Sequence, residues 1–191
     1  MRIAVDYTAA ARQGGGIGRY TRELISAVLS AEDDSDHHHY LLMAAAAGLG
    51  EAWEREAARL QDLIDADHLT LRPLPLTDDW MARIWQRMHL PIPAEWIVGR
   101  VDLFYSPDFV LPPLHRRTPA LLTVHDLSFL RHPETFPPSL RSYLERAVPR
   151  SVERAHHILA DSHSTRRDLI DLLDTPPEKV PVIVSGSLSI S

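Results

Sequence analysis

The chain has 191 residues, of which 45% are hydrophobic and 24% are charged, a composition typical of a soluble globular protein. This length is enough for one α/β domain with a sizeable core and too short for two domains of ordinary size. The formal net charge of -6 argues against a nucleic-acid-binding protein, and the absence of cysteine excludes disulfides, cysteine catalysis and thiolate metal sites.

The N-terminus has no long apolar segment followed by a small-residue cleavage site, so the sequence predicts no secretory signal. No apolar run approaches the length of about 18 residues that a membrane-spanning helix needs. We therefore expect a cytoplasmic protein, with peripheral contact at the inner membrane face as an alternative.

Apolar runs of strand length alternate along the chain with segments whose apolar residues recur at helical spacing. The predicted strands are 2–7, 40–46, 68–72, 101–106, 120–124, 157–160 and 180–184. The predicted helices are 19–29, 51–64, 78–88, 139–154 and 165–173, with loops at 107–119 and 128–138. This alternation is typical of a doubly wound α/β domain, in which a Rossmann-like parallel sheet has helices on both faces.

Two of the predicted helices carry apolar stripes that we expect to pack on the sheet. The first stripe consists of Tyr20, Leu24, Ala27 and Val28, and the second of Trp80, Ile84, Trp85 and Met88. The second helix also carries Arg83 and Arg87, so an alternative is that it lies on a membrane surface. Two arginines are few for electrostatic anchoring, and the helical spacing favours packing in the core.

Four glycines lie within five positions after the first strand, at Gly14, Gly15, Gly16 and Gly18. We expect their backbone to turn with positive φ and to leave N–H groups uncovered at the positive end of the following helix dipole. Such a segment favours a phosphate-type anion, and the alternative is a merely flexible connection. Neither a dinucleotide fingerprint nor a nucleoside-triphosphate P-loop is present, because the third glycine and the Gly-Lys-Ser/Thr ending are missing.

Polar residues follow several predicted strands, where Ser106, His125 and Ser162 stand at or just after the strand end. Ligands of parallel sheets bind outside the carboxyl ends of the strands, so we expect these residues and the glycine segment to converge on one crevice. His125 is the candidate for site chemistry because a titratable side chain at this edge is well placed, and the alternative is an imidazole that only caps the strand.

Asp126 is a weaker candidate for catalysis than its neighbour His125. We expect its carboxylate to hold the loop 127–131 by hydrogen bonding in preference to transferring protons. A hydrolase triad of Ser106, His125 and Asp126 is not expected, because the sequence has no G-x-S-x-G elbow and adjacent His and Asp side chains seldom align for one.

The histidine triplet 37–39 follows a segment that contains Asp33, Asp34 and Asp36. Imidazole and carboxylate groups are common metal ligands, which makes this segment a candidate metal site. Consecutive histidines that enter a strand point to opposite faces, however. We therefore expect a solvated loop and no metal site.

Five segments of the chain, taken in order, carry a resemblance to a known family. They are IAVDYTAAARQGGGIGRYTRELISAVL, RIWQRMHLPIP, VDLFYSPDFVLPP, PALLTVHDLSFLRHPETFP and HHILADSHSTRRDLIDLLDTPPEKVPVI. Together they resemble the N-terminal domain of the retaining GT-B glycosyltransferases of family 4 (group 1), which include bacterial mannosyltransferases. The resemblance implies one of two Rossmann-like lobes, of which the N-terminal lobe mainly binds the acceptor and the C-terminal lobe holds the nucleotide-sugar.

The resemblance implies transfer of a sugar from a nucleotide-diphosphate sugar to a saccharide or lipid-linked acceptor, with no cofactor and no metal. Gly15 and Gly16 would approach the donor diphosphate and stabilise its developing charge, while Gly14 and Gly18 would shape the turn. His125 would hydrogen-bond the transferred sugar or the acceptor. The residues expected to line the acceptor cleft are Tyr105, Ser106 and Ser162.

The chain departs from the family at VIVSGSLSIS, where a typical member would enter its interdomain linker. We therefore expect residues 1–191 to be an acceptor-side domain without its donor-binding domain, with negligible turnover alone and a tendency to self-associate. The alternative is a non-catalytic domain of the same fold that binds a sugar or phosphate or assembles with a partner. A second Rossmann-like half beyond Ser191, with two glutamates spaced by seven residues, would favour the transferase.

Overall fold

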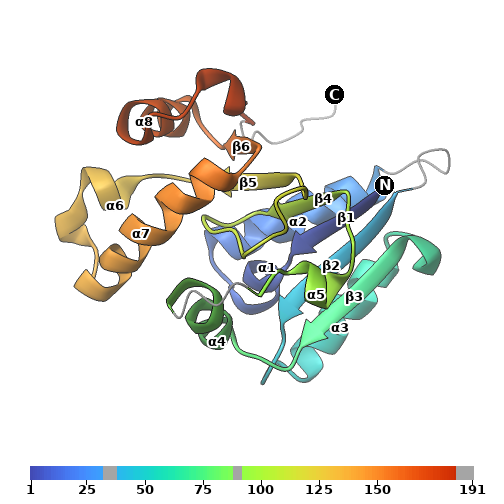
Figure 1. The fold of residues 1–191 in the computed structure, drawn as a ribbon. Coiled ribbons are helices and arrows are strands. Elements are labelled where there is room, and N and C mark those ends of the chain that lie inside the picture. Colours follow the sequence, from blue (N-terminus) through green and yellow to red (C-terminus); the bar gives the residue numbers. More distant parts are fainter. Residues whose placement is uncertain (32–37, 88–91, 184–191) are drawn as a thin grey trace, which may run out of the picture. The chain divides into compact units, whose positions relative to one another are not determined.

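The computed structural model of the chain describes residues 1–31, 38–87 and 92–183 (Figure 1). They form two compact units, the first made of residues 1–107 and 112–119 and the second of residues 108–111 and the chain from 120 onward. Within the described ranges, no helix combines the length and the apolar character needed to cross a membrane.

The first unit contains four parallel strands in the order β3-β2-β1-β4. Their bounds are Arg2–Asp6 for β1, His39–Ala45 for β2, Leu69–Leu74 for β3 and Leu103–Ser106 for β4. The side chains of β2 are buried from Tyr40 onward, as expected for a strand covered on both faces. The edge strand β3 continues through Pro73, where the sequence predicts its end, because an edge strand tolerates the missing N–H donor.

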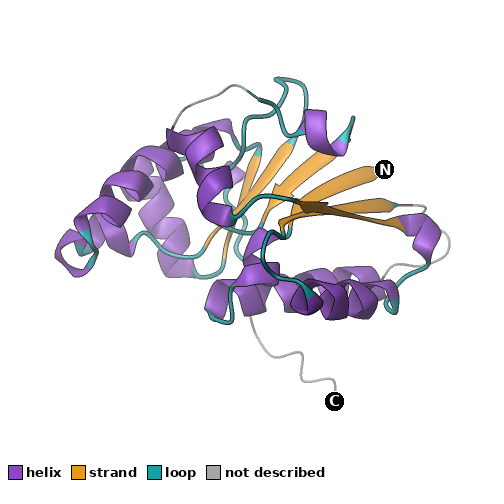
Figure 2. Ribbon diagram, turned by 90° about the horizontal axis from the view of Figure 1, so that it is seen from below, coloured by secondary structure: helices purple, strands orange, loops and turns teal. Residues whose placement is uncertain are grey.

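The helices of the first unit cover both faces of these strands (Figure 2). Their bounds are α1 Thr8–Arg12, α2 Gly16–Ser30, α3 Glu51–Gln61, α4 Asp78–Ala82 and α5 Glu95–Val98, with the 3-10 helix η1 Ala66–His68 and the π-helical turn η2 Arg83–Arg87. After β3 the chain returns to the other side of β1, which is the reversal of strand order that characterises a doubly wound sheet. The predicted doubly wound, Rossmann-like α/β fold is confirmed.

The second unit contains the parallel strands β5 (Ala120–Val124) and β6 (His157–Ala160), both with the bounds that the sequence predicts. Its helices are α6 Ser128–Arg131, α7 Pro138–Arg154 and α8 His163–Leu173, with the 3-10 helices η3 Pro133–Thr135 and η4 Pro177–Lys179. The predicted loop 128–138 thus contains two short helices. In place of the strand predicted at 180–184, the described residues show one bridge between Ala160 and Val182, and Val184 lies outside them.

The buried face of α2 differs from the predicted stripe. Val28 is 36% exposed. The buried residues of α2 are Gly18, Thr21, Ile25 and Leu29. Thr21 tolerates burial because its hydroxyl donates to the carbonyl oxygen of Ile17 at 2.9 Å. The prediction was wrong because it counted apolar side chains, and half of the buried positions are a glycine and a threonine.

The tryptophan stripe predicted for 78–88 is also only partly buried. Trp85 is buried, but Trp80 is 52% exposed, and the buried residue near it is Met81. Met81 and Trp85, four positions apart, share the buried face, and Trp80 lies at its margin, before the π-helical turn that begins at Arg83. The Arg83 guanidinium carbon lies 5.4 Å from the Trp80 ring centroid, a cation–π contact at the surface. Met88 lies outside the described residues.

A polar cluster inside the first unit joins the end of β1 to α2 and α3. The fully buried Tyr7 donates from its hydroxyl to Glu56 Oε1 at 2.5 Å. Arg59 donates to both carboxylate oxygens of Glu56, at 2.6 and 3.1 Å, and to Ser26 Oγ at 2.7 Å. Burial and the neighbouring Glu56 raise the pKa of Tyr7 well above its ordinary value, so the phenol stays protonated as a donor.

The charge of Glu56 makes this cluster sensitive to acid. Burial alone would raise the pKa of Glu56, but hydrogen bonds from Arg59 and Tyr7 and attraction to Arg59 and Arg22 lower it below its ordinary value. A carboxyl group with a lower pKa in the folded state stabilises the fold above its unfolded pKa, which is about 4.3. That stabilisation is lost as the pH falls through the folded pKa.

Glu56→Gln should therefore make the free energy of unfolding less dependent on pH between about pH 5 and pH 3. Urea unfolding followed by tryptophan fluorescence measures this dependence. Glu54→Gln is the matched control, because Glu54 is exposed on the same helix, and it should keep the wild-type slope. Equal slopes for wild type and Glu56→Gln would show that the cluster does not hold Glu56 charged.

Candidate functional site

The glycine segment joins two helices instead of a strand and a helix. The short helix α1 follows β1, and α2 begins at Gly16 with Gly15 as its N-cap and no side-chain cap. The predicted positive φ is wrong for these residues. In the described part of the chain, the glycines with positive φ are Gly48, Gly50 and Gly99. The short helix α1 lies between β1 and the glycine segment, and the glycines of this segment adopt negative φ, so the connection needs no residue in the left-handed region.

The four glycines divide into two kinds by their surroundings. Gly14, Gly15 and Gly16 are exposed, and a Cβ atom added at any of them would meet nothing within 4 Å. Gly18 is buried, and its Cβ would lie 2.1 Å from the carbonyl oxygen of Gln13 and 2.7 Å from that of Ala9. Gly18 therefore permits the first turn of α2 to pack on α1, while residues 14–16 leave the N-terminus of α2 uncovered.

Arginine side chains fix the position of the glycine segment. Arg12 donates to the carbonyl oxygens of Ala45 and Ala47, at 3.0 and 2.9 Å, and its Nε lies 3.0 Å from Asp78 Oδ1. These contacts tie α1 to the chain that leaves β2. Arg22 on α2 donates to the carbonyl oxygen of Gln13 at 3.0 Å and so closes the segment from its other side.

Gly18→Ala should lower the free energy of unfolding by about 1–3 kcal/mol, because the added methyl group overlaps two carbonyl oxygens and forces α1 and α2 apart. Gly14→Ala is the matched control and should stay within about 1 kcal/mol of wild type, since its methyl group enters open space. Urea denaturation of both variants measures the difference. Equal stabilities would contradict a packing role for Gly18.

The predicted cleft residues at the end of β4 are core residues of the first unit. Tyr105 is 6% exposed and Ser106 is 1% exposed. In the parallel pairing, Tyr105 lies opposite Val5 of the central strand β1. Their contact with an acceptor stays a prediction.

In the second unit, the register of β5 with β6 brings His125 and Asp161 together. Val124 pairs with Ala160, so the next residue of each strand leaves the sheet at the same level. Nδ1 of His125 lies 3.4 Å from Oδ2 of Asp161. The side chain of His125 is 11% exposed and that of Asp161 is 27% exposed, so the pair lies at the margin of the core.

Thr165, in the first turn of α8, holds the other side of Asp161. Its Oγ1 lies 3.0 Å from Asp161 Oδ1 and 2.8 Å from the carbonyl oxygen of His125. Ser162 is the N-cap of α8, because its Oγ accepts from the backbone N–H of Thr165 at 3.0 Å and lies 2.9 Å from Thr165 Oγ1. The hydroxyl of Ser162 thus helps to position Asp161, and its contact with an acceptor stays a prediction.

Two neighbours of His125 were missed by sequence reasoning. The Phe109 ring meets the His125 ring edge to face, with centroids 5.6 Å apart. Burial raises the pKa of the Asp108 carboxyl, although a hydrogen bond from the Phe109 N–H and the charge of His125 oppose the rise. The sequence offers one signal for this neighbour, the acidic Asp108 two positions after the end of β4. It lies in the proline-containing segment 107–119, which the sequence predicts only as a loop.

A buried serine holds this short segment in the second unit. Ser151 of α7 accepts from the backbone N–H of Leu111 at 3.0 Å and donates to the carbonyl oxygen of Ala147 at 2.8 Å. Residues 108–111 are therefore anchored on α7 beside His125.

Asp126 makes the contact that the sequence predicts for holding the loop. Its Oδ1 accepts from the backbone N–H of Ser128, at 2.7 Å, where α6 begins. The side chain is otherwise exposed. A catalytic role for Asp126 stays a prediction that no contact in the second unit supports.

No group of three or more histidine, aspartate or glutamate side chains among the described residues is placed to hold a metal ion. His39, which begins β2, directs its ring nitrogens to Thr70 Oγ1 at 2.8 Å and to the carbonyl oxygen of Asp67 at 3.0 Å. His37 and the acidic segment before it lie outside the described residues.

Comparison with known proteins decides the family. Residues 14–186 match the model of the family described as Glycosyltransferase Family 4. This chain belongs to glycosyltransferase family 4. The membership predicted from the five ordered segments is thereby confirmed. The matched residues include the glycine segment, 14–18, and the His125 group, which consists of His125, Asp161, Thr165, Phe109 and Asp108.

A relative of the family 4 chain is the O-antigen chain mannosyltransferase B of Escherichia coli. The two are 32% identical over 78 residues, which are 41% of this chain and 20% of the relative. The similarity therefore spans one fifth of the relative's length.

Proposed function

We propose that this family 4 chain is the acceptor-side half of a retaining glycosyltransferase that moves a sugar from a nucleotide-diphosphate sugar to a saccharide acceptor. The observation that carries the proposal is His125 at the end of β5, largely buried and held by Asp161, in a chain of this family. The name of the E. coli relative, an O-antigen chain mannosyltransferase, supports mannose as the first sugar to test.

In this proposal His125 orients the sugar. The contact of Nδ1 with Asp161 fixes the plane of the imidazole and favours a proton on Nδ1. The other ring nitrogen, Nε2, then hydrogen-bonds a hydroxyl of the transferred sugar or of the acceptor. Phe109 packs on the ring and limits its rotation, so the hydrogen-bonding direction is set before the substrate arrives.

The N-terminus of α2 serves the leaving group in this proposal. Its 15 residues give a full helix dipole, and backbone N–H groups of the first turn favour the charge that develops on the diphosphate. Gly14, Gly15 and Gly16 let a phosphate approach the backbone because no Cβ intervenes. Because the helix dipole and the backbone amides would stabilise the charge on the diphosphate, the proposal invokes no metal and no cofactor.

We also propose that a donor-binding domain completes the enzyme and that residues 1–191 transfer sugar negligibly without it. The test is therefore a transfer assay on the full-length gene product, with a nucleotide-activated mannose as donor and a mannose-terminated oligosaccharide as acceptor.

In that assay, His125→Ala should lower kcat by about 10²-fold, the order of loss typical when a positioned hydrogen-bonding group at the reacting centre is removed. Asp161→Asn should lower kcat by roughly 10-fold, because it removes the charge that positions the imidazole and leaves the imidazole in place. Asp171→Asn is the matched control, since Asp171 is exposed on α8, and it should match wild type. An unchanged kcat for His125→Ala would refute the role of His125, and oligosaccharide binding without transfer would favour a non-catalytic sugar-binding domain.

A further inference from the structure

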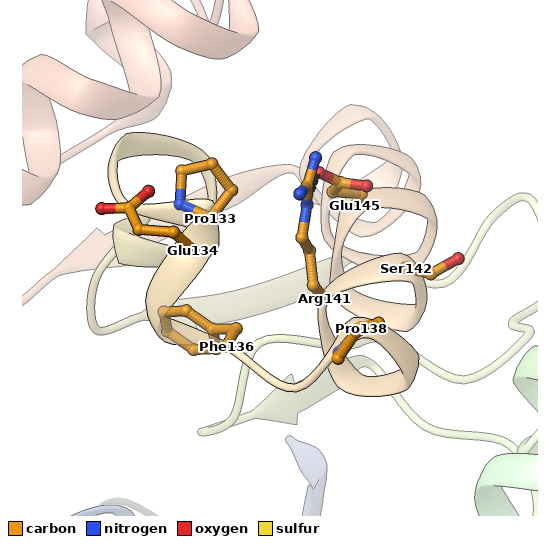
Figure 3. Close-up of a pocket in the computed structure, with 7 residues that line it drawn as sticks. All are labelled: Pro133, Glu134, Phe136, Pro138, Arg141, Ser142 and Glu145. Atoms are coloured by element: carbon orange, nitrogen blue, oxygen red, sulfur yellow. Dashed lines mark hydrogen bonds and ion pairs between the residues drawn. The ribbon is translucent and has the colours of Figure 1, made fainter.

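A pocket of about 400 Å³ lies in the second unit between η3 and the first turns of α7 (Figure 3). Its apolar lining consists of Pro133, Phe136 and Pro138. Its polar lining consists of Glu134, Arg141, Ser142 and Glu145. None of these residues belongs to the His125 group. The volume lies in the usual range for small-molecule sites, about 300–1,000 Å³.

The apolar side of the pocket is built from rigid parts. Pro133 and Pro138 have a fixed φ, which limits the conformations of the short connection between η3 and α7. Backbone hydrogen bonds close η3 on itself, from Thr135 N–H to the carbonyl oxygen of His132 at 3.0 Å and from Phe136 N–H to that of Pro133 at 3.4 Å. The half-buried ring of Phe136 is thus presented by a segment that needs no ligand to order it.

The polar side of the pocket is an ion pair on α7. Arg141 Nε donates to Glu145 Oε1 at 2.7 Å, and the two side chains remain 44% and 36% exposed. Figure 3 shows both side chains on the side of α7 that faces η3. An arginine has five N–H donors and a carboxylate has two acceptor oxygens, so one mutual bond leaves directed donors and acceptors available to a ligand.

The charges of the pocket oppose an anionic ligand. The pocket lining contains two carboxylates, Glu134 and Glu145, and one guanidinium, Arg141. His132 lies beside Glu134, with Nδ1 3.7 Å from Oε1, and even a protonated His132 would only bring the sum to zero. A phosphate or carboxylate therefore gains little here, whereas a neutral ligand with many hydroxyl groups can use both the donors and the acceptors.

We infer that this pocket binds a neutral saccharide unit of the acceptor chain, with the C–H face of a sugar ring against Phe136 and its hydroxyls on Arg141 and Glu145. The identity of the ligand rests on the proposed function, which makes a saccharide the acceptor. The pocket and its lack of net positive charge rest on residues 133–145 alone.

Binding of a linear mannotriose to the full-length gene product, without donor, tests the inference by calorimetry. Arg141→Ala and Phe136→Ala should each weaken binding at least 10-fold. Arg146→Ala is the matched control on α7, exposed and outside the pocket, and should bind within twofold of wild type. Circular dichroism verifies that each variant is folded.

Two further measurements separate this inference from the proposed function. In the transfer assay, Arg141→Ala should raise the KM for the oligosaccharide at least 10-fold with little change in kcat, since it removes binding remote from the reacting bond. Mannotriose binding that depends on Arg141, in a protein without transfer activity, would uphold the pocket and refute the proposed function. Unchanged binding and KM in both pocket variants, or tighter binding of mannose 1-phosphate than of methyl mannoside, would overturn the inference.

Discussion

The parallel pairing of β5 with β6 decides which side chains meet in the candidate site. Val124 lies opposite Ala160, so the residues that follow, His125 and Asp161, come within 3.4 Å. A register shifted by one residue would bring a different residue to the imidazole. The strands are mostly apolar, apart from Thr123 in β5 and His157 at the start of β6, and the candidate site lies at the edge where their carboxyl ends meet. Thr165 of α8 contacts the carboxylate of Asp161, so the ends of β5 and β6 and the first turn of α8 together position the imidazole of His125.

Much of the fold was predictable because its signals are strong. Both strands of the second unit have their predicted bounds, since short apolar runs between turn residues leave little choice. The errors arose because hydrophobic periodicity detects only apolar residues that recur over several turns. Gly18 and Thr21 are buried without being apolar, and Trp80 is apolar but half exposed at the margin of its helix's buried face. The short helices α1, α5 and α6 complete too few turns to show a period at all.

The candidate site was predictable only in part. His125 and Ser162 stand out in the sequence because each is a polar residue just after a predicted strand. The partner of His125 could not be identified in the same way, because the pairing of Asp161 with His125 depends on which strands are neighbours and in which register. Asp108 reaches the site through a loop, whose path no residue pattern predicts. At the glycine segment, the sequence predicts positive φ, whereas the structure gives these glycines negative φ.

The position of the proton on the neutral His125 ring tests this account most directly. Nitrogen-15 NMR of the imidazole distinguishes the two tautomers. If Asp161 accepts a hydrogen bond from the ring, the wild-type protein carries the proton on Nδ1, and Asp161→Ala moves it to Nε2. A wild-type ring protonated on Nε2, or a tautomer that Asp161→Ala leaves unchanged, would contradict the claim that the register of β5 and β6 sets the orientation of His125.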